Sequence, residues 1–246
     1  MPGKVIVITG ANGGLGRALA KRFASEEETV LLLGRTLSKV QQVAEEVGAR
    51  AVAVQCDVSS PESVKAAFGQ IANRHANIDA LINSAGIFRP FLIEEANDTQ
   101  ILDTLLSNLG GPVLCSRSAI PLLRRGGHII NVSSESVVTE LPHLVLYQGT
   151  KAGLERFSSS LNLELAGKGI RVTVVRAGQM FGPESALQFE PAAAARLFEA
   201  ALERGFNLME RGTSRYESVT HIFRMIIDSP PDLYVDQVAY RGRPLD

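Results

Sequence analysis

A tyrosine and a lysine stand four residues apart in the stretch YQGTK, as Tyr147 and Lys151, and Ser134 precedes the tyrosine by thirteen residues. In a helix, residues i and i+4 share one face, so the phenol and the ammonium would project to the same side. Free tyrosine, with a pKa of about 10, is a poor base at neutral pH. A nearby Lys⁺ stabilises phenolate and lowers that pKa, which suits acid–base catalysis. A serine hydroxyl beside them would donate a hydrogen bond to a substrate oxygen on which charge develops. These residue types predict proton transfer at an oxygen atom.

A glycine-rich segment, TGANGGLG at residues 9–16, directly follows the first apolar run and opens a helical pattern. Glycine allows a tight turn and close backbone approach, and a helix N-terminus offers unpaired N–H groups to a pyrophosphate. The spacing departs from G-x-G-x-x-G, but its place in a first β-loop-α unit predicts dinucleotide binding. The predicted contacts are Gly10, Asn12, Gly13, Gly14, Leu15 and Gly16.

The residues after the second apolar run bear on the choice between NAD and NADP. An NAD site usually has an acid there, whereas this chain has Arg35 and Thr36, with Lys39 one turn later. An arginine fork matches a 2′-phosphate through charge-assisted hydrogen bonds. The sequence therefore predicts NADP(H) in preference to NAD(H), with a solvated surface arginine as the alternative.

Short, nearly all-apolar runs alternate with helical patterns along the chain, as in a parallel sheet covered on both faces. The expected strands are 4–9, 29–34, 49–56, 78–84, 127–134, 170–177 and, more weakly, 236–242. The expected helices are 15–26, 38–47, 61–75, a long one near 98–124, and 147–166. This order predicts an α/β protein with a single-domain Rossmann fold, a doubly wound sheet of about seven strands over residues 1–246.

From Lys4 to about Arg176 the sequence resembles the classical short-chain dehydrogenase/reductase family. The residues that carry the resemblance are TGxxxGxG at 9–16, Asp57 and Val58 in CDV, NSAG at 83–86, Asn108, Ser134, and YxxxK at Tyr147 and Lys151. These motifs in order are very specific, whereas YxxxK alone is common by chance.

The resemblance implies hydride transfer between a nicotinamide cofactor and a carbonyl or secondary alcohol. It makes Asn108, Ser134, Tyr147 and Lys151 the catalytic set, with Lys151 also on the nicotinamide ribose and Asn108 positioning a relay water. Further cofactor contacts implied are Asp57, Val58, Asn83, Ala85, Gly86, Tyr147, Lys151 and Met180. Members of the family commonly form homodimers or homotetramers through the helices expected near 98–124 and 147–166.

The stretch AGQMFG at 177–182 departs from the family, which usually has Pro-Gly and then a threonine on the carboxamide. The threonine position corresponds to Gly182, and backbone at Met180 or the side chain of Ser185 are alternative contacts. The segment 178–215, expected without a strand, predicts a lid over the substrate. Its apolar residues indicate an apolar carbonyl or alcohol. The candidate substrate contacts are Ser134, His143 and Phe181.

Composition excludes several other classes of protein. The formal net charge of −1, with dispersed Lys and Arg, argues against nucleic acid or an anionic membrane surface as partner. The apolar runs are too short for a membrane helix, and the first one reads as a strand rather than a secretory signal. The two cysteines and four histidines show no metal-ligand spacing. Reduced, buried thiols and surface or loop histidines are expected, in a cytoplasmic protein.

Two other functions remain open on the sequence. A dinucleotide-binding redox sensor or scaffold without turnover would explain the altered 177–182 stretch. A sugar-nucleotide epimerase or dehydratase shares YxxxK, but such enzymes are usually longer and space their glycines differently. The G-x-S-x-G elbow of a hydrolase is absent from the sequence.

Overall fold

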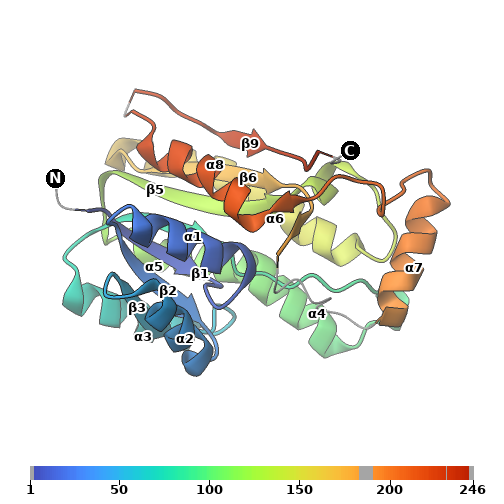
Figure 1. Cartoon of the computed structure of the whole chain (residues 1–246), viewed down its shortest axis with the longest axis horizontal. Coiled ribbons are helices and arrows are strands. Elements are labelled where there is room, and N and C mark those ends of the chain that lie inside the picture. Colours follow the sequence, from blue (N-terminus) through green and yellow to red (C-terminus); the bar gives the residue numbers. More distant parts are fainter. Residues whose placement is uncertain (1–2, 183–190, 231, 244–246) are drawn as a thin grey trace.

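A seven-stranded parallel sheet organises the computed structural model, which describes residues 3–182, 191–230 and 232–243 (Figure 1). Its strands are β1 (Val5–Thr9), β2 (Thr29–Gly34), β3 (Ala51–Gln55), β4 (Ile78–Asn83), β5 (Leu123–Ser134), β6 (Arg171–Ala177) and β9 (Gln237–Ala239). Their order is β3-β2-β1-β4-β5-β6-β9, so the chain winds outward from β1 in one direction and from β4 in the other. The predicted doubly wound α/β fold is confirmed.

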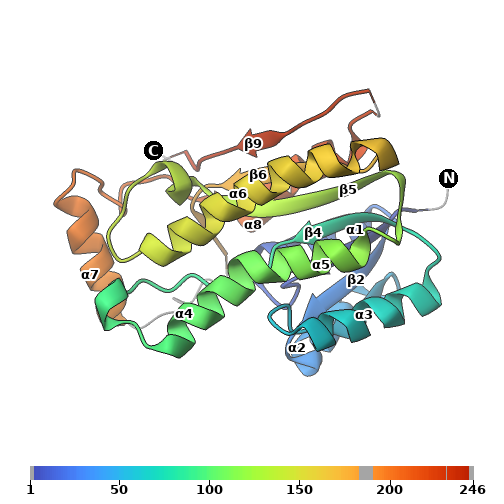
Figure 2. The ribbon, with the colours of Figure 1, turned by 180° about the vertical axis from the view of Figure 1, so that it is seen from behind.

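Helices cover both faces of this sheet. The α-helices of the described residues are α1 (Gly14–Ser25), α2 (Leu37–Val47), α3 (Pro61–Arg74), α4 (Asp98–Leu105), α5 (Gly111–Ala119), α6 (Val145–Leu165), α7 (Pro191–Leu202), which packs away from the sheet, and α8 (Tyr216–Asp228). Helices α1, α2 and α8 enclose one apolar core with Ile6 and Ile8, and α3, α5 and α6 enclose the other with Val7 (Figure 2). Successive strand residues point to opposite faces, which explains why the strands read as unbroken apolar runs.

The helix expected near 98–124 is interrupted and ends earlier. A π-helical turn at Leu106–Gly110 separates α4 from α5, and α5 stops at Ala119. Strand β5 begins at Leu123, four residues before the predicted start, and its register against β4 shifts on the way to His128. Gly126, in the left-handed region with φ 84°, lies within this irregular first part of the strand. Such a bulge has no periodic apolar pattern, so the sequence did not reveal it.

The expectation of no strand within 178–215 was wrong. Residues Met180–Phe181 form β7, which pairs in parallel with β8 at Ser214–Arg215. Two residues per strand are too few to leave a period-2 pattern, and the partners are far apart in sequence. Residues 183–190 of this segment, including Ser185, lie outside the described part of the structure.

The expectation of surface or loop histidines was wrong for His128, which is buried in β5. Cys56 and Cys115 are free and buried, as expected. Within the described ranges, no helix is long and apolar enough to cross a bilayer. The same residues contain no group of His, Cys, Asp or Glu that could hold a metal ion.

Candidate active site

A cavity of about 640 Å³ opens at the carboxyl ends of the strands, where ligands bind in doubly wound sheets. Its walls come from the loops after β1, β2, β3, β4 and β6 and from the end of β5, together with residues of α6 and α8. Strands β1 and β4, between which the direction of winding changes, are neighbours in the sheet. The cavity therefore lies at the topological switch point of the fold.

The glycine-rich loop forms one wall through backbone atoms. Gly10 has φ 69°, and a Cβ there would come within 2.8 Å of the Ala85 Cα. A Cβ at Gly16 would come within 2.4 Å of the Gly10 carbonyl oxygen, so side chains are excluded at both positions. The residue before α1, Gly13, supplies no side-chain cap, and the first-turn N–H groups adjoin the cavity. All six predicted contacts, Gly10, Asn12, Gly13, Gly14, Leu15 and Gly16, line it.

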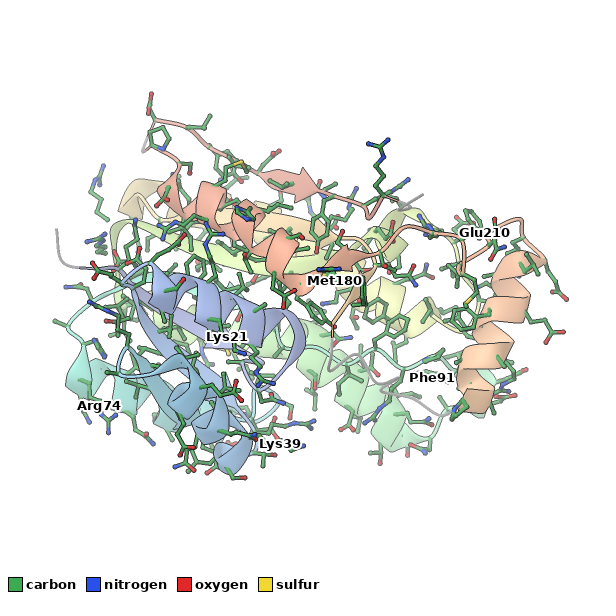
Figure 3. All side chains as sticks on the ribbon, in the orientation of Figure 1. Lys21, Lys39, Arg74, Phe91, Met180 and Glu210 are labelled. Carbon is green, nitrogen blue, oxygen red and sulfur yellow. The ribbon has the colours of Figure 1, made fainter. Side chains whose placement is uncertain are left out.

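Cationic side chains lie at the end of the cavity beside β2. Arg35, Thr36 and Lys39 line it, and all three are exposed. Among the described residues, neither Arg35 nor Lys39 has a recorded side-chain hydrogen bond or ion pair. Figure 3 shows Lys39 on α2, well apart from Met180, which also lines the cavity. Within the part of the chain that the structure describes, this end presents positive charge without a paired carboxylate.

Two of the implied cofactor residues lie behind the cavity. Asp57 directs its carboxylate to Ser59, accepting from the backbone N–H at 3.0 Å and the hydroxyl at 2.6 Å, whereas Val58 next to it lines the cavity. The buried Asn83 amide donates to Asn131 Oδ1 at 2.8 Å, which ties β4 to β5. Ala85 and Gly86, which follow β4, do line the cavity. The roles visible for the Asp57 and Asn83 side chains are structural.

The acid–base group assembles from β5 and α6. Lys151 and Tyr147 lie on one face of α6, with the Lys151 Nζ 5.8 Å from the centre of the Tyr147 ring. The Nζ donates to the Val132 carbonyl oxygen at 2.8 Å, just before the end of β5. Ser134 ends that strand and hydrogen-bonds the Tyr147 phenol. Serine, tyrosine and lysine therefore meet at one wall of the cavity, as the spacing predicted.

Burial acts on both titratable members of this group. It raises the pKa of the Tyr147 phenol, and the hydrogen bond with Ser134 opposes that rise. It lowers the pKa of the Lys151 ammonium to about 8. Burial disfavours the charged form of each group, so the phenolate needs positive charge nearby. At pH 7 Lys151 remains mostly protonated and supplies part of that charge.

Asn108 joins the site indirectly, through the loop after β4. It is fully buried in the π-helical turn, where its Oδ1 accepts from the Ile87 N–H at 2.7 Å and its Nδ2 donates to the Ile87 carbonyl at 2.9 Å. Gly86 lies between Asn108 and Lys151: a Cβ on it would be 3.2 Å from the Asn108 Oδ1 and 3.5 Å from the Lys151 Nζ. Asn108 thus fixes the loop that borders Lys151.

An apolar wall stands beside the acid–base group. Leu141 and Leu144 cluster with Leu197 and Ala201 of α7, against Phe88, Tyr147 and Leu208. The Phe88 ring meets the Tyr147 ring edge-on, with centroids 5.0 Å apart. Helix α7 also makes the Arg196–Glu95 ion pair, but both partners are about half exposed, so it contributes at most about 1 kcal/mol. Burying a leucine such as Leu197 contributes about 1.5–3 kcal/mol, so apolar contacts hold α7 more firmly.

The candidate substrate contacts have different surroundings. Ser134 lines the cavity, while His143 and Phe181 are not among the described lining residues. His143 is buried with φ 63°, and its carbonyl accepts from the Phe91 N–H at 2.8 Å. In Figure 3, Phe91 is seen beside α7. Phe181 is 43% exposed. Met180 lines the cavity, with its sulfur accepting from the Tyr240 hydroxyl at 3.0 Å.

Several lining residues were not identified from the sequence. Ser107 and Tyr216 both line the cavity. Tyr216 begins α8, far along the chain from every motif, and its sequence context gave no signal. Glu135, next to Ser134, is mostly buried and pairs with Arg211 at 3.0 Å and Arg241 at 3.3 Å.

Comparisons with known proteins agree with this geometry. A family model described as short chain dehydrogenase matches residues 4–186. Carbonyl reductase family member 4 of Xenopus laevis is 35% identical over 179 residues, covering 71% of this chain and 75% of the relative. The 3-oxoacyl-[acyl-carrier-protein] reductase FabG of Aquifex aeolicus is 36% identical over 184 residues, covering 72% of this chain and 74% of the relative.

Solved structures extend the similarity of fold to nearly the whole chain. A short-chain dehydrogenase from Streptomyces avermitilis superposes with a TM-score of 0.84 at 25% identity, covering 98% of this chain and 89% of that one. An alcohol dehydrogenase from Thermococcus sibiricus, complexed with 5-hydroxy-NADP, gives a TM-score of 0.83 at 20% identity, covering 99% and 98%. The chain belongs to the short-chain dehydrogenase family of oxidoreductases, which bind a nicotinamide dinucleotide.

Proposed function

We propose that this protein is an NADP(H)-dependent oxidoreductase that interconverts an apolar carbonyl compound and its secondary alcohol within one catalytic domain. The observation that carries the proposal is the meeting of Ser134, Tyr147 and Lys151 at the wall of a cavity that reaches Arg35. The relatives' names point the same way, since they include carbonyl, 3-oxoacyl and hydroxysteroid oxidoreductases.

The cavity fits a dinucleotide along its length. Backbone at Gly10 and Gly16 replaces side chains where a pyrophosphate must approach closely, and the N-terminus of α1 offers N–H groups to it. Arg35 and Lys39 offer charge to a 2′-phosphate. Lys151 and Tyr147 border the opposite part, where the nicotinamide ribose would lie. When bound, the nicotinamide supplies a hydride to the carbonyl carbon or accepts one from the alcohol.

The protein's own residues transfer the proton that accompanies the hydride. In reduction, the Tyr147 phenol donates its proton to the substrate oxygen, and in oxidation the phenolate takes it back. The Lys151 ammonium favours the phenolate, and the Ser134 hydroxyl donates a hydrogen bond to the substrate oxygen. Asn108 holds the loop bordering Lys151 and would position the relay water.

The apolar cluster of Leu141, Leu144, Leu197 and Ala201 supports an apolar substrate. A charged group placed there would lose hydration without gaining a partner among these side chains. The segment 178–215, which carries α7, would act as the lid over this substrate.

Titration with NADPH and with NADH, followed by nicotinamide fluorescence, tests the cofactor preference. We expect NADPH to bind at least roughly tenfold more tightly, because one charged hydrogen bond from Arg35 contributes about 1.5–3 kcal/mol. Arg35→Asp should remove that preference while NADH binding changes little. Arg74→Asp, on exposed Arg74 away from the cavity, is the matched control and should leave both affinities unchanged (Figure 3).

Turnover is then measured on a panel of apolar ketones and aldehydes. Loss of NADPH absorbance with any member supports the enzyme. Tight NADPH binding with no turnover across the panel would favour a redox sensor or scaffold instead. Equal affinities for the two nucleotides, unchanged in Arg35→Asp, would show Arg35 to be a surface residue.

We also propose that the protein forms a homodimer or homotetramer through α4, α5 and α6. Exposed apolar side chains on these helices include Leu102, Leu105 and Leu163, the last 77% exposed. Burying them against a second copy would remove apolar area from water. Sedimentation velocity should give a dimer or tetramer, and Leu163→Lys should shift the distribution toward monomer.

The two buried free thiols fit a reducing compartment, which supports our proposal of a cytoplasmic location. Fractionation of cells producing the tagged protein tests it, and recovery in any other compartment would contradict it.

A further inference from the structure

Tyr216 is the first residue of α8, and the short β7–β8 ladder fixes its position. Met180 pairs with Ser214 and Phe181 with Arg215, so Gly182 and Tyr216 follow as the next residues of the two strands. The Ser214 N–H donates to the Gln179 carbonyl at 2.9 Å, which extends the connection at the other end. The ladder thereby brings the start of α8 to the loop that follows β6.

The Tyr216 ring occupies the space beside two glycines. A Cβ at Gly182 would come within 2.6 Å of the ring's Cδ2, a distance that side chains do not tolerate. A Cβ at Gly14 would lie 3.4 Å from both the Cζ and the hydroxyl oxygen. The ring therefore spans the distance from the loop after β7 to the glycine-rich loop.

The glycine-rich loop and residues Gly178 and Met180 line the cavity, and Tyr216 lines it as well. The glycine-rich loop presents the N-terminus of α1, and Gly178 follows Ala177, which pairs with Ser134 at the end of β5. A phenol in this place can donate to a diphosphate oxygen, while the ring face covers apolar parts of the nucleotide. Gly182 has no side chain that could make either contact.

We propose that Tyr216 is a nucleotide-binding residue, whose hydroxyl donates to the diphosphate and whose ring closes the cavity between the two loops. This inference rests on the proposed function and adds a contact from α8, outside the motifs that the sequence presents. It also explains why position 182 is a glycine, because only a residue without Cβ leaves room for the Tyr216 ring.

Two substitutions separate the hydroxyl from the ring. Tyr216→Phe removes only the hydroxyl, and we expect NADPH to bind about tenfold more weakly, the lower end for a hydrogen bond to a charged group. Tyr216→Ala also removes the ring and should weaken binding further. Tyr234→Phe is the matched control, because the Tyr234 hydroxyl donates to the Val172 carbonyl at 3.2 Å and does not line the cavity. Affinities come from fluorescence titration, and thermal unfolding confirms that each variant folds.

A double-mutant cycle with Gly182 tests the ring independently. Gly182→Ala should weaken NADPH binding in the native background, because its Cβ displaces the ring. In the Tyr216→Ala background the same change should have no further effect. Equal, additive losses in both backgrounds would overturn the inference, as would a Tyr216→Phe variant that binds NADPH like the native protein. If the native protein binds neither nucleotide, both proposals fail. If the native protein binds NADPH and the Tyr216 and Gly182 variants bind it equally tightly, this inference alone fails.

Discussion

Tyr147 and Lys151 show why one side chain is not enough for the proposed chemistry. Burial raises the pKa of the phenol, although oxidation of an alcohol would need the phenolate. The same burial lowers the pKa of Lys151 to about 8, so its charge is retained at pH 7 but only by a moderate margin. The pair becomes an effective acid–base only with further help, from the Ser134 hydrogen bond and from the positive charge of an oxidised nicotinamide.

Replacing Tyr147 by phenylalanine removes only the phenolic hydroxyl and so tests its role in proton transfer. Tyr147→Phe should lower kcat by about 10²–10⁴-fold, the usual contribution of a positioned acid, while the affinity for NADPH stays within about threefold. Rates come from NADPH absorbance with a carbonyl substrate, and affinities from fluorescence titration. A variant that retained a substantial fraction of the native rate would rule out proton transfer by this phenol.

The interruption between α4 and α5 is the clearest link between an element and the site. Asn108 lies in the π-helical turn between these two helices, and from there its side chain hydrogen-bonds both the N–H and the carbonyl of Ile87. Such turns often occur at functional sites. Gly110, Gly111 and Pro112 follow Asn108, but no local pattern in the sequence indicated that its side chain would bind Ile87.

Asn108→Ala tests the structural side of this role. It leaves the partly buried Ile87 N–H and carbonyl without the side-chain bonds that they have here, and each lost hydrogen bond of this kind costs about 0.5–1.5 kcal/mol. We expect the free energy of unfolding to fall by about 1–3 kcal/mol, measured by urea denaturation. Asn77→Ala, on an exposed asparagine, should change it by less than about 0.5 kcal/mol. A similar small change in Asn108→Ala would show that the loop after β4 does not depend on this side chain.

At the scale of the whole molecule, the central strands carry a buried histidine that responds to pH. The His128 ring lies in β5 and its Nε2 donates to the Thr173 hydroxyl at 2.7 Å, since that hydroxyl itself donates to the Val235 carbonyl. Within the described residues its Nδ1 is buried without a partner. Burial, with nearby Arg171 adding a smaller effect, lowers the pKa of His128 from 6.5 to about 3.

This depressed pKa predicts loss of stability in acid. Below pH 6.5 the His128 imidazole binds a proton in the unfolded chain but not in the folded protein, so the free energy of unfolding falls as pH falls from 6.5 toward 3. Each pH unit amounts to about 1.4 kcal/mol, so about 2 kcal/mol should be lost between pH 7 and pH 5. Urea denaturation at the two values measures the loss. His128→Gln should reduce this pH dependence, while His221→Gln, exposed on α8, should not. An unchanged dependence in His128→Gln would assign the acid sensitivity to other groups.

The sequence by itself determined the parts of this protein that local patterns encode. Apolar runs marked β1 to β6 because helices cover both faces of the sheet that these strands form. The glycine loop and the spacing of Ser134, Tyr147 and Lys151 were visible because each motif obeys the geometry of a single turn, strand end or helix face.

Only the tertiary structure decided what depends on contacts between distant segments. The β7–β8 ladder, the burial of Glu135 against Arg211, and the position of Tyr216 over Gly14 each join residues remote in sequence. Such contacts leave no period along the chain, because two residues of strand or one ring suffice to make them. The sheet brings these segments together at its carboxyl edge, and there the cavity takes its final shape.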